Sequence, residues 1–204
     1  MKIVFATGNK NKMKEIRKIL GGLGMDILSM AEVGAIGDVE ENGSSFAENS
    51  MIKARAVAEE LKNKGESDCI VLADDSGLEV DYLGGEPGIY SARYLGEDTP
   101  YSIKNAKIIE RLNGVPDEER SARFVCAMAA VFPDGSEECY EATYEGRIGY
   151  EEKGPNGFGY DPIFYLPDRG LYSAELDPDE KNRISHRGKA LEGIKNILKD
   201  RITV

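Results

Sequence analysis

The pattern that organises the chain is an apolar run, Ile70 to Ala73, which leads directly into Asp74-Asp75-Ser76-Gly77. A short apolar run with polar flanks is typical of a buried strand, and a strand that ends in acidic residues delivers them to a sheet edge, where open α/β sheets bind ligands. Successive strand residues face opposite sides, so Asp74 and Asp75 do not both enter one pocket while the strand stays regular. Either one of them carries the chemistry, or the strand kinks at Gly77. An exposed turn of the same composition is the alternative.

Hydrophobic periodicity predicts two strands and two helices before this motif. Met13, Ile16 and Leu20 recur at helical spacing, and Ser45-Phe46-Ala47-Glu48 fits the capping box of a helix N-terminus. The predicted elements are strands from Lys2 to Ala6 and from Met25 to Met30, and helices from about Asn11 to Leu20 and from Ser45 to about Lys64.

Turn signals and periodicity divide the second half of the chain in the same way. Pro133-Asp134-Gly135-Ser136 separates two strand-like runs and therefore predicts a hairpin. The predicted elements are a strand from Leu78 to Leu83, a helix from Thr99-Pro100 to near Asn113-Gly114, hairpin strands from Phe124 to Phe132 and from Glu137 to Arg147, and a final helix that opens at residues 184–190.

Composition and charge narrow the class of protein. A chain of 204 residues fits one domain, or two small lobes that share a sheet. Its net charge of −11 argues against coating nucleic acid or an anionic membrane, so an anionic substrate needs a local basic cluster or a bridging metal. The apolar N-terminal run is too short for a signal peptide or a membrane span. Cys69, Cys126 and Cys139 form no Cys-x-x-Cys pair, and we expect reduced core thiols in a cytoplasmic protein.

A candidate phosphate-binding turn, Thr7-Gly8-Asn9-Lys10-Asn11-Lys12, lies between the first predicted strand and helix. Free backbone N–H groups and the helix dipole favour a phosphate at such a point, and Lys10 and Lys12 add positive charge. The second glycine and the Lys-Ser/Thr pair of a Walker A loop are missing. A solvated first turn with its lysines in water explains the same residues.

An acidic turn from Asp38 to Gly43 precedes the helix that carries Lys53. Its carboxylates either complement the helix dipole or hold a hard cation such as Mg²⁺, which needs carboxylate oxygens from one or two residues plus substrate phosphates. In the second case Glu40 or Glu41 supplies one carboxylate and Asp75 supplies another. Composition does not choose between the two readings.

Two unusual clusters occur in the last third of the chain. In Gly157-Phe158-Gly159-Tyr160-Asp161, glycine lets a planar ligand approach the main chain and Phe158 can stack on a base; a loop with its aromatic rings tucked beneath it is the alternative. Lys181 precedes Ser185-His186-Arg187, which contains the only histidine of the chain. Such a histidine is usually structural or a cap, but next to an arginine it also suits recognition of a base or phosphate.

Taken together, these clusters resemble the inosine triphosphate pyrophosphatase family, whose members hydrolyse non-standard purine nucleoside triphosphates. One such motif is weak evidence, but seven in family order, between residues 7 and 190, are strong evidence. Ser50 and Asn42 stand where many relatives have alanine and threonine, and neither should alter the chemistry. The matching segments are Thr7-Gly8-Asn9-x-x-Lys12, Glu40-Glu41-x-Gly43, Ser45-Phe46-x-Glu48-Asn49, Ala73-Asp74-Asp75-Ser76-Gly77-Leu78, Pro87-Gly88-Ile89-Tyr90-Ser91-Ala92-Arg93, Gly157-Phe158-Gly159-Tyr160-Asp161-Pro162 and Ser185-His186-Arg187.

The resemblance implies an α/β fold with a mixed, central twisted sheet flanked by helices, in which residues 1–204 form a single domain of two lobes with an active-site cleft between them. It also implies a homodimer and Mg²⁺-dependent hydrolysis of ITP, dITP or XTP to the nucleoside monophosphate and pyrophosphate. In this reading Asp75 is the general base and a metal ligand, and Glu40 is the other ligand. The implied phosphate contacts are Thr7, Gly8, Asn9, Lys10, Asn11, Lys12, Lys53 and Lys181. The implied substrate and base contacts are Ser76, Phe158, Gly159, Tyr160, Asp161, His186 and Arg187.

Two other functions stay open at this stage. A related pyrophosphatase that acts on modified pyrimidine or 7-methylguanine nucleotides shares the cleft architecture, but should lack the clusters at residues 158–161 and 185–187. A non-catalytic nucleotide-binding regulator has little use for Asp75 together with Glu40, because extra negative charge weakens triphosphate binding unless a metal is present. The sequence alone does not separate attack at the α-phosphorus from hydrolysis at the γ-phosphate.

Overall fold

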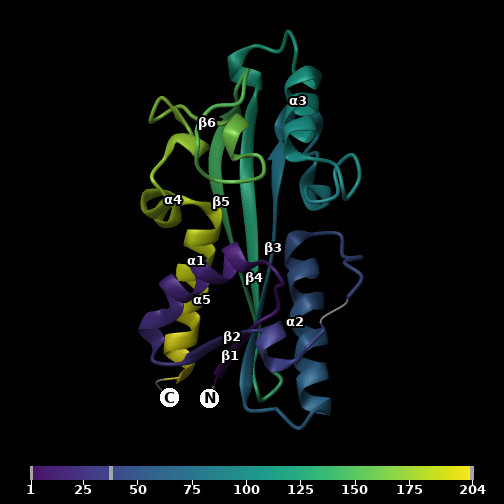
Figure 1. Cartoon of the computed structure of the whole chain (residues 1–204), viewed down its shortest axis with the longest axis vertical. Coiled ribbons are helices and arrows are strands. Elements are labelled where there is room, and N and C mark those ends of the chain that lie inside the picture. The colour runs from purple at the N-terminus through teal and green to yellow at the C-terminus, as the bar shows by residue number, and fades with distance from the viewer. Residues whose placement is uncertain (1, 37–38, 203–204) are drawn as a thin grey trace. The chain divides into compact units, whose positions relative to one another are not determined.

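The computed structural model describes residues 2–36 and 39–202, without the side chains of Asn11 and Ile202. This part of the chain forms a seven-stranded sheet in the order β2-β1-β3-β4-β5-β6-β7, together with five α-helices (Figure 1). β1 is parallel to β2 and β3, whereas β6 is antiparallel to β5 and β7, which confirms the mixed α/β sheet. The strands are β1 (Lys2–Phe5), β2 (Asp26–Ser29), β3 (Cys69–Val80), β4 (Ser121–Val131), β5 (Glu137–Ile148), β6 (Phe164–Leu166) and β7 (Leu171–Tyr172). The helices are α1 (Lys10–Leu20), α2 (Phe46–Asn63), α3 (Tyr101–Arg111), α4 (Pro178–Ile184) and α5 (His186–Ile202).

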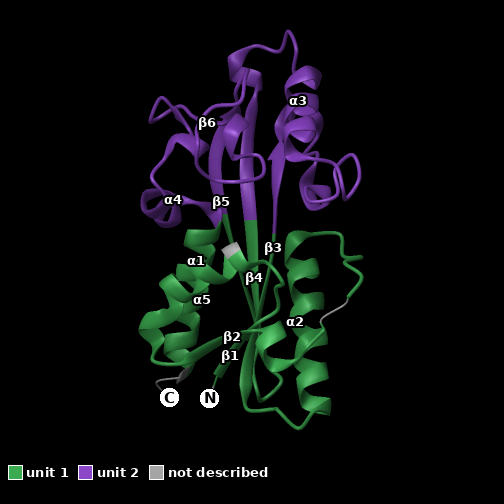
Figure 2. Cartoon of the chain, in the orientation of Figure 1, with its two compact units in different colours: residues 1–75, 126–142, 187–204 green, residues 76–125, 143–186 purple. Residues whose placement is uncertain are grey.

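The chain forms two compact units, shown in different colours in Figure 2. Unit 1 comprises Met1–Asp75, Cys126–Ala142 and Arg187–Val204, and unit 2 comprises Ser76–Val125 and Thr143–His186. The strands β3, β4 and β5 each supply residues to both units. Neither unit is therefore a continuous stretch of the sequence.

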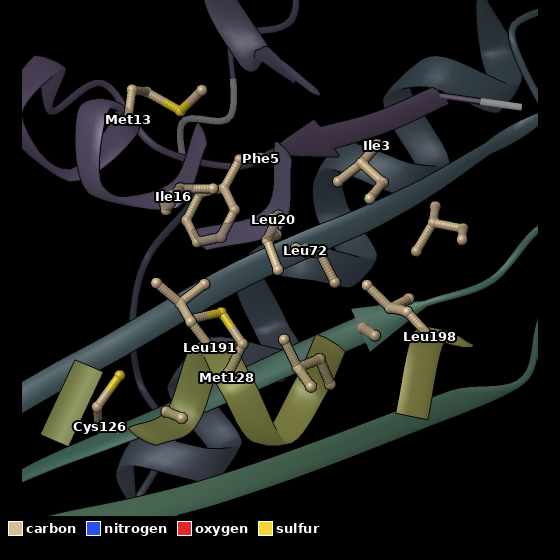
Figure 3. Close-up of a cluster of buried hydrophobic side chains, with 14 of the residues drawn as sticks. Ile3, Phe5, Met13, Ile16, Leu20, Leu72, Cys126, Met128, Leu191 and Leu198 are labelled. Carbon is tan, nitrogen blue, oxygen red and sulfur yellow. The ribbon is translucent and has the colours of Figure 1, made fainter. Parts of the chain in front are cut away.

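The core of unit 1 has two layers, one on each face of its strands. Alternate residues of β1, β3 and β4 pack against α1 and α5 on one face, in the cluster of Figure 3, which includes Phe5, Leu72 and Leu191. The intervening residues of the same strands, Val71 among them, pack with Ala54 and Leu61 of α2 on the other face. The two-residue period of the strands thus sorts every side chain to one helical layer or the other.

Unit 2 has its own apolar core, built around Leu78 of β3, Ile108 of α3 and Phe164 of β6. A fully buried arginine, Arg120, braces this unit by donating to the carbonyl oxygens of Leu112, Ile148 and Gly149 at 2.7–2.8 Å. Across the described residues of both units, no helix is long and apolar enough to cross a membrane.

Two predictions about β3 are wrong. It neither ends nor turns at the aspartates, and the separate strand predicted from Leu78 to Leu83 is its continuation to Val80, followed by a 3₁₀ turn at Asp81–Leu83. The strand continues because its backbone still finds partners: the Leu78 N–H donates to Ser91 Oγ at 2.8 Å, and the Val80 N–H donates to the carbonyl oxygen of Glu86 at 3.2 Å. A buried strand can therefore carry both carboxylates in its middle.

The remaining elements lie close to their predicted positions, with three differences. α4, β6 and β7 were not predicted, and α3 begins after Pro100 while the Thr99 hydroxyl donates to the carbonyl oxygen of Leu95 instead of capping the helix. Cys69 and Cys126 are buried as expected, but Cys139, on β5, is exposed. The hairpin and the final helix are confirmed.

Candidate active site

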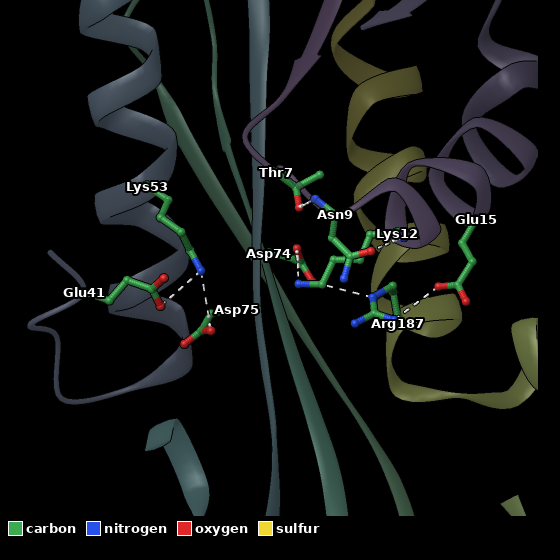
Figure 4. Close-up of polar contacts among 9 residues, drawn as sticks. All are labelled: Thr7, Asn9, Lys12, Glu15, Glu41, Lys53, Asp74, Asp75 and Arg187. Carbon is green, nitrogen blue, oxygen red and sulfur yellow. Dashed lines mark hydrogen bonds and ion pairs between the residues drawn. The ribbon is translucent and has the colours of Figure 1, made fainter. Parts of the chain in front are cut away.

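The strand period places Asp74 and Asp75 in different environments. Asp74 lies two residues after Leu72 on β3 and therefore faces the same side, the layer of α1 and α5. Asp75 lies two residues after Ala73 and therefore faces α2. Both side chains are largely buried, at 1% and 12% exposure. Figure 4 shows the two carboxylates on opposite sides of β3, each with its own cation. The prediction that they do not share a pocket is confirmed within unit 1.

On the first face, Asp74 forms ion pairs with two positively charged side chains. Lys12 Nζ, from the first turn of α1, donates to both carboxylate oxygens at 3.0 and 2.8 Å, and Arg187 Nε, from α5, lies 3.5 Å from Asp74 Oδ2. Burial by itself raises the pKa of the Asp74 carboxyl, but the charges of Lys12 and Arg187 outweigh it and hold that pKa well below its usual range. Arg187 Nη1 also donates to Glu15 Oε2 at 3.2 Å. This face is therefore a buried, charge-balanced network.

On the second face, one lysine joins two carboxylates. Lys53 Nζ lies 3.2 Å from Glu41 Oε2 and 3.5 Å from Asp75 Oδ1. Burial raises the pKa of the Asp75 carboxyl above its ordinary value, Lys53 opposes this rise, and the neighbouring Glu41 charge adds to it. A carboxylate of raised pKa at the edge of solvent is suited to accepting a proton from water.

The structure places Glu41, rather than its neighbour Glu40, beside Lys53 and Asp75. Glu40 is exposed, and Asp38 lies outside the described residues. Within residues 2–36 and 39–202, no group of three or more histidine, cysteine, aspartate or glutamate side chains is arranged to hold a metal ion. The second face thus offers carboxylate oxygens from at most two residues, the donor set with which proteins hold Mg²⁺ when substrate phosphates complete the coordination.

The predicted phosphate turn joins β1 to α1 and is held by its own side chains. Thr7 is buried, and its Oγ1 accepts from the Asn9 N–H at 3.1 Å, while Asn9 Oδ1 accepts from the Lys12 N–H at 3.3 Å. Gly8 and Lys10 are exposed, and the Asn11 side chain lies outside the described residues. The turn and the Lys12–Asp74 ion pair therefore belong to one local arrangement at the start of α1.

The predicted cluster from Gly157 to Asp161 lies in unit 2, and the side chain of Asp161 organises it. This buried carboxylate accepts from the Phe158 N–H at 2.9 Å and from the Ser173 hydroxyl at 2.9 Å, and it also forms an ion pair with Lys181. The Lys181 ammonium lies 5.1 Å from the centre of the Phe158 ring, which is 43% exposed. The buried Asp161 carboxylate thus holds the Lys181 ammonium close to the exposed Phe158 ring.

Four other predicted contacts lie in unit 2, and two of them, Tyr160 and His186, have structural roles as well. The Tyr160 hydroxyl donates to the carbonyl oxygen of Ser91 at 2.8 Å, and its ring meets that of Tyr101 edge-on. His186 is buried and stacks on Phe124, with 4.9 Å between ring centres. Ser76 is half-buried on β3, and Gly159 has φ +67° beside the Tyr101 ring.

Sequence reasoning gave no role to Asn49, although it ends one of the matching segments, and it missed Glu15 and Ser173. Asn49 lies one helical turn before Lys53 on α2, a spacing that signals a shared face, and its Oδ1 accepts from the Gly43 N–H at 2.8 Å. Glu15 lies 172 positions from Arg187, and Ser173 lies 12 positions from Asp161 with turns between them, so no local pattern signals these contacts. A cavity of about 440 Å³ in unit 1, near Cys69 and Phe132, is lined by none of the predicted site residues.

Comparison with known proteins agrees with the motifs. The sequence profile of the Ham1 family matches residues 3–197. A dITP/XTP pyrophosphatase of Clostridium perfringens is 50% identical over 198 residues, 97% of each chain, and one of Geobacillus kaustophilus is 48% identical over 189 residues, 93% of this chain and 90% of that protein. The structure of the Staphylococcus aureus Ham1 protein matches with a TM-score of 0.88 at 37% identity, covering 98% of this chain and 100% of that one. These matches confirm the resemblance drawn from the motifs: the chain belongs to the Ham1 family.

Proposed function

We propose that this protein hydrolyses non-standard purine nucleoside triphosphates, of the dITP and XTP class, to the nucleoside monophosphate and pyrophosphate. The relatives named dITP/XTP pyrophosphatase support the substrate class, and cleavage between the α- and β-phosphates is part of the proposal. The observation that carries the proposal is the second face of β3, where Asp75 has a raised pKa and shares the Lys53 ammonium with Glu41. That arrangement combines a base for water with positive charge for phosphate.

Asp75 acts as the general base in this proposal. Its carboxylate takes a proton from a water molecule while the water oxygen bonds to the α-phosphorus. The bond from that phosphorus to the oxygen bridging to the β-phosphate then breaks, and pyrophosphate leaves with the bond's electron pair. Burial beside Glu41 raises the pKa of Asp75 and so makes this carboxylate a stronger base than an exposed aspartate.

Asp75 would also hold Mg²⁺, with Glu40 or Glu41 as the second carboxylate. The donor set fits a hard cation, because both carboxylates of the second face already converge on the Lys53 ammonium. When bound, Mg²⁺ neutralises charge on the phosphate oxygens and on the departing pyrophosphate. We assign triphosphate contacts to the turn from Thr7 to Lys12, to Lys53 and to Lys181.

Recognition of the base is assigned to Ser76, to the loop from Phe158 to Asp161, and to His186 and Arg187. The Phe158 ring is exposed and is therefore accessible for stacking on a purine. Inosine and xanthosine present an acceptor at O6, whereas adenine presents an amino group that leaves a donor of the site without a partner. A site of this kind discriminates by roughly 10⁴-fold.

The deciding experiment measures pyrophosphate release from deoxyinosine, xanthosine, adenosine and guanosine triphosphates, with and without Mg²⁺. We expect release from the first two, and only with the metal. Release of inorganic phosphate in place of pyrophosphate would overturn the assigned bond. Cleavage confined to modified pyrimidine or 7-methylguanine nucleotides would identify a different pyrophosphatase, and binding of deoxyinosine triphosphate with Mg²⁺ but without cleavage would identify a regulator.

A further inference from the structure

The ammonium group of Lys53 lies between two carboxylates that come from different parts of unit 1. It is 3.2 Å from Glu41 Oε2 and 3.5 Å from Asp75 Oδ1, and the Lys53 side chain is only 17% exposed. Figure 4 shows the ammonium bridging the two carboxylates, with Glu41 on the segment before α2 and Asp75 on β3. A single positive charge therefore offsets two negative charges in a partly buried setting.

The fold holds this arrangement firmly. The segment before α2 is tied to the first turns of the helix because the Gly43 N–H donates to Asn49 Oδ1 at 2.8 Å and the Ser44 N–H donates to Glu48 Oε2 at 2.7 Å. Lys53 follows Asn49 by one turn and so projects from the same face of α2. Glu41 and Lys53 are thus positioned together by short-range contacts within one unit.

A divalent cation needs the same carboxylate oxygens that Lys53 now contacts. Two like charges do not share a space a few ångströms wide without strong repulsion, particularly where water is partly excluded. A metal ion therefore binds these carboxylates only if the ammonium moves away. The polyphosphate of a nucleotide is the one component of the proposed reaction that attracts the ammonium elsewhere.

We propose that Lys53 is a cationic placeholder, which holds Glu41 and Asp75 in position and releases them to the metal ion only when a triphosphate draws its ammonium away. This inference rests on the proposed function and adds the order of events: the triphosphate draws the Lys53 ammonium away before the metal ion takes the carboxylates. Metal affinity is low in the nucleotide-free protein, and metal and nucleotide strengthen each other's binding. Coupling between two ligands is typically about 5- to 150-fold, and it is the same in both directions.

The test measures binding of Mn²⁺, as a probe for Mg²⁺, to nucleotide-free protein by calorimetry and by electron paramagnetic resonance. Replacing Lys53 by methionine removes the competing charge and keeps an unbranched side chain that is one atom shorter. We expect Lys53→Met to bind Mn²⁺ at least about fivefold more tightly than wild type, the lower end of ordinary coupling. Lys53→Arg, which keeps the charge, should bind like wild type. Lys12→Met removes a lysine paired with the other aspartate and should also leave Mn²⁺ affinity close to wild type.

The second readout is the coupling itself. Mn²⁺ affinity is measured again with the α,β-methylene analogue of deoxyinosine triphosphate, which is not cleaved between its α- and β-phosphates. We expect the analogue to tighten Mn²⁺ binding in wild type, and to do so much less in Lys53→Met. Far-UV circular dichroism and the melting temperature establish that each variant is folded, and Lys53→Gln is the substitute if the methionine variant is not.

Two results would overturn the placeholder. One is equal or weaker Mn²⁺ binding by folded Lys53→Met, and the other is coupling that is unchanged in that variant. Asp75→Asn separates this failure from failure of the proposed function. If Asp75→Asn abolishes Mn²⁺ binding and wild type releases pyrophosphate, the hydrolase stands and only the role of Lys53 falls. Wild type that releases no pyrophosphate from any triphosphate would refute the function itself.

Discussion

At the scale of single residues, the two adjacent aspartates of β3 have opposite effects on stability. Lys12 and Arg187 lower the pKa of the Asp74 carboxyl despite its burial, so ionised Asp74 stabilises the fold. Burial, with the Glu41 charge adding to it, raises the pKa of the Asp75 carboxyl, so ionised Asp75 destabilises the fold. Strain of this kind is expected where a side chain serves a reaction rather than the fold.

We therefore expect Asp75→Asn to raise the melting temperature at pH 7 while lowering turnover by roughly 10²–10⁴-fold. Because the folded-state pKa of Asp75 is raised, its effect on wild-type stability is most favourable below the ordinary value of 3.8 and is lost as pH rises through the folded value. The neutral asparagine avoids that loss, so its advantage should grow above pH 3.8 and vanish below it. Melting curves recorded below and above pH 3.8 measure the effect, because each kcal/mol of stability shifts the melting temperature by about 2–4 °C in a chain of this size.

Asp74→Asn is the matched control, with the same chemical change one residue away. It leaves Lys12 and the buried Arg187 without their shared counter-ion, so we expect destabilisation by about 3 kcal/mol at pH 7. Because the folded-state pKa of Asp74 is lowered, its stabilisation is present above 3.8 and is lost as pH falls below that value. A melting temperature that moves in the same direction in both variants would contradict this account.

The sequence was enough to separate Asp74 from Asp75, because that follows from the period of a strand alone. It did not identify the partner of each carboxylate. The choice between Glu40 and Glu41 depends on how the segment before α2 is tied to Asn49, which no spacing rule reports. The contact of Glu15 with Arg187 joins residues 172 positions apart, and such pairs become visible only in the folded chain.

At the scale of elements, periodicity located most helices and strands, and it failed where local composition conflicts with tertiary pairing. Asp-Asp-Ser-Gly is good turn sequence, yet β3 passes through it because the segment from Glu86 to Ser91 satisfies the backbone beyond. α4 has a clear start signal: Asp177 is the N-cap and accepts from the Asp179 N–H, and Pro178 is the first helical residue. It is too short to show an apolar stripe, so periodicity alone does not detect it.

The connection between β1 and α1 gives a test at this scale. A Cβ on Gly8 would have Met30 Cε, at 3.8 Å, as its one neighbour within 4 Å, and its φ lies outside the left-handed region, so the fold itself accepts alanine there. If phosphate oxygens approach this backbone, the added methyl group obstructs them. We expect Gly8→Ala to keep or slightly raise the melting temperature, and to raise KM for deoxyinosine triphosphate by about tenfold or more, roughly the loss of one hydrogen bond to a charged group.

Gly43→Ala is the control, because a Cβ there would lie 2.7 Å from Asn49 Oδ1 and 2.8 Å from Glu48 Cβ. Its expected effect is a lower melting temperature from the displaced start of α2. An unchanged KM in Gly8→Ala would remove the turn from phosphate binding. A stability loss in that variant as large as that of Gly43→Ala would show that Gly8 serves the fold.

At the scale of the whole molecule, the chain passes from one unit to the other within three strands and once more at the start of α5. The motifs implied the mixed sheet, but no common sequence signal marks where one core gives way to the other: that point lies in the acidic motif of β3, at Asp75–Ser76, and within an apolar run of β4, at Val125–Cys126. Each unit is built from segments that are distant in sequence. Because β3, β4 and β5 run through both units, the loss of these strands in one unit removes their support from the other. This continuity predicts that the units unfold together.

We expect thermal unfolding to be a single transition by every probe. The chain has no tryptophan, and its ten tyrosines all belong to unit 2 except Tyr140, so tyrosine fluorescence reports mainly on unit 2. A tryptophan introduced by Phe132→Trp, in the unit 1 core, reports on the other unit when it is excited selectively. In this variant the tryptophan signal should give the same midpoint as far-UV circular dichroism, and in wild type the tyrosine signal should do the same. Midpoints that differ by several degrees would mean that the shared strands fray at the boundary and that each core melts by itself.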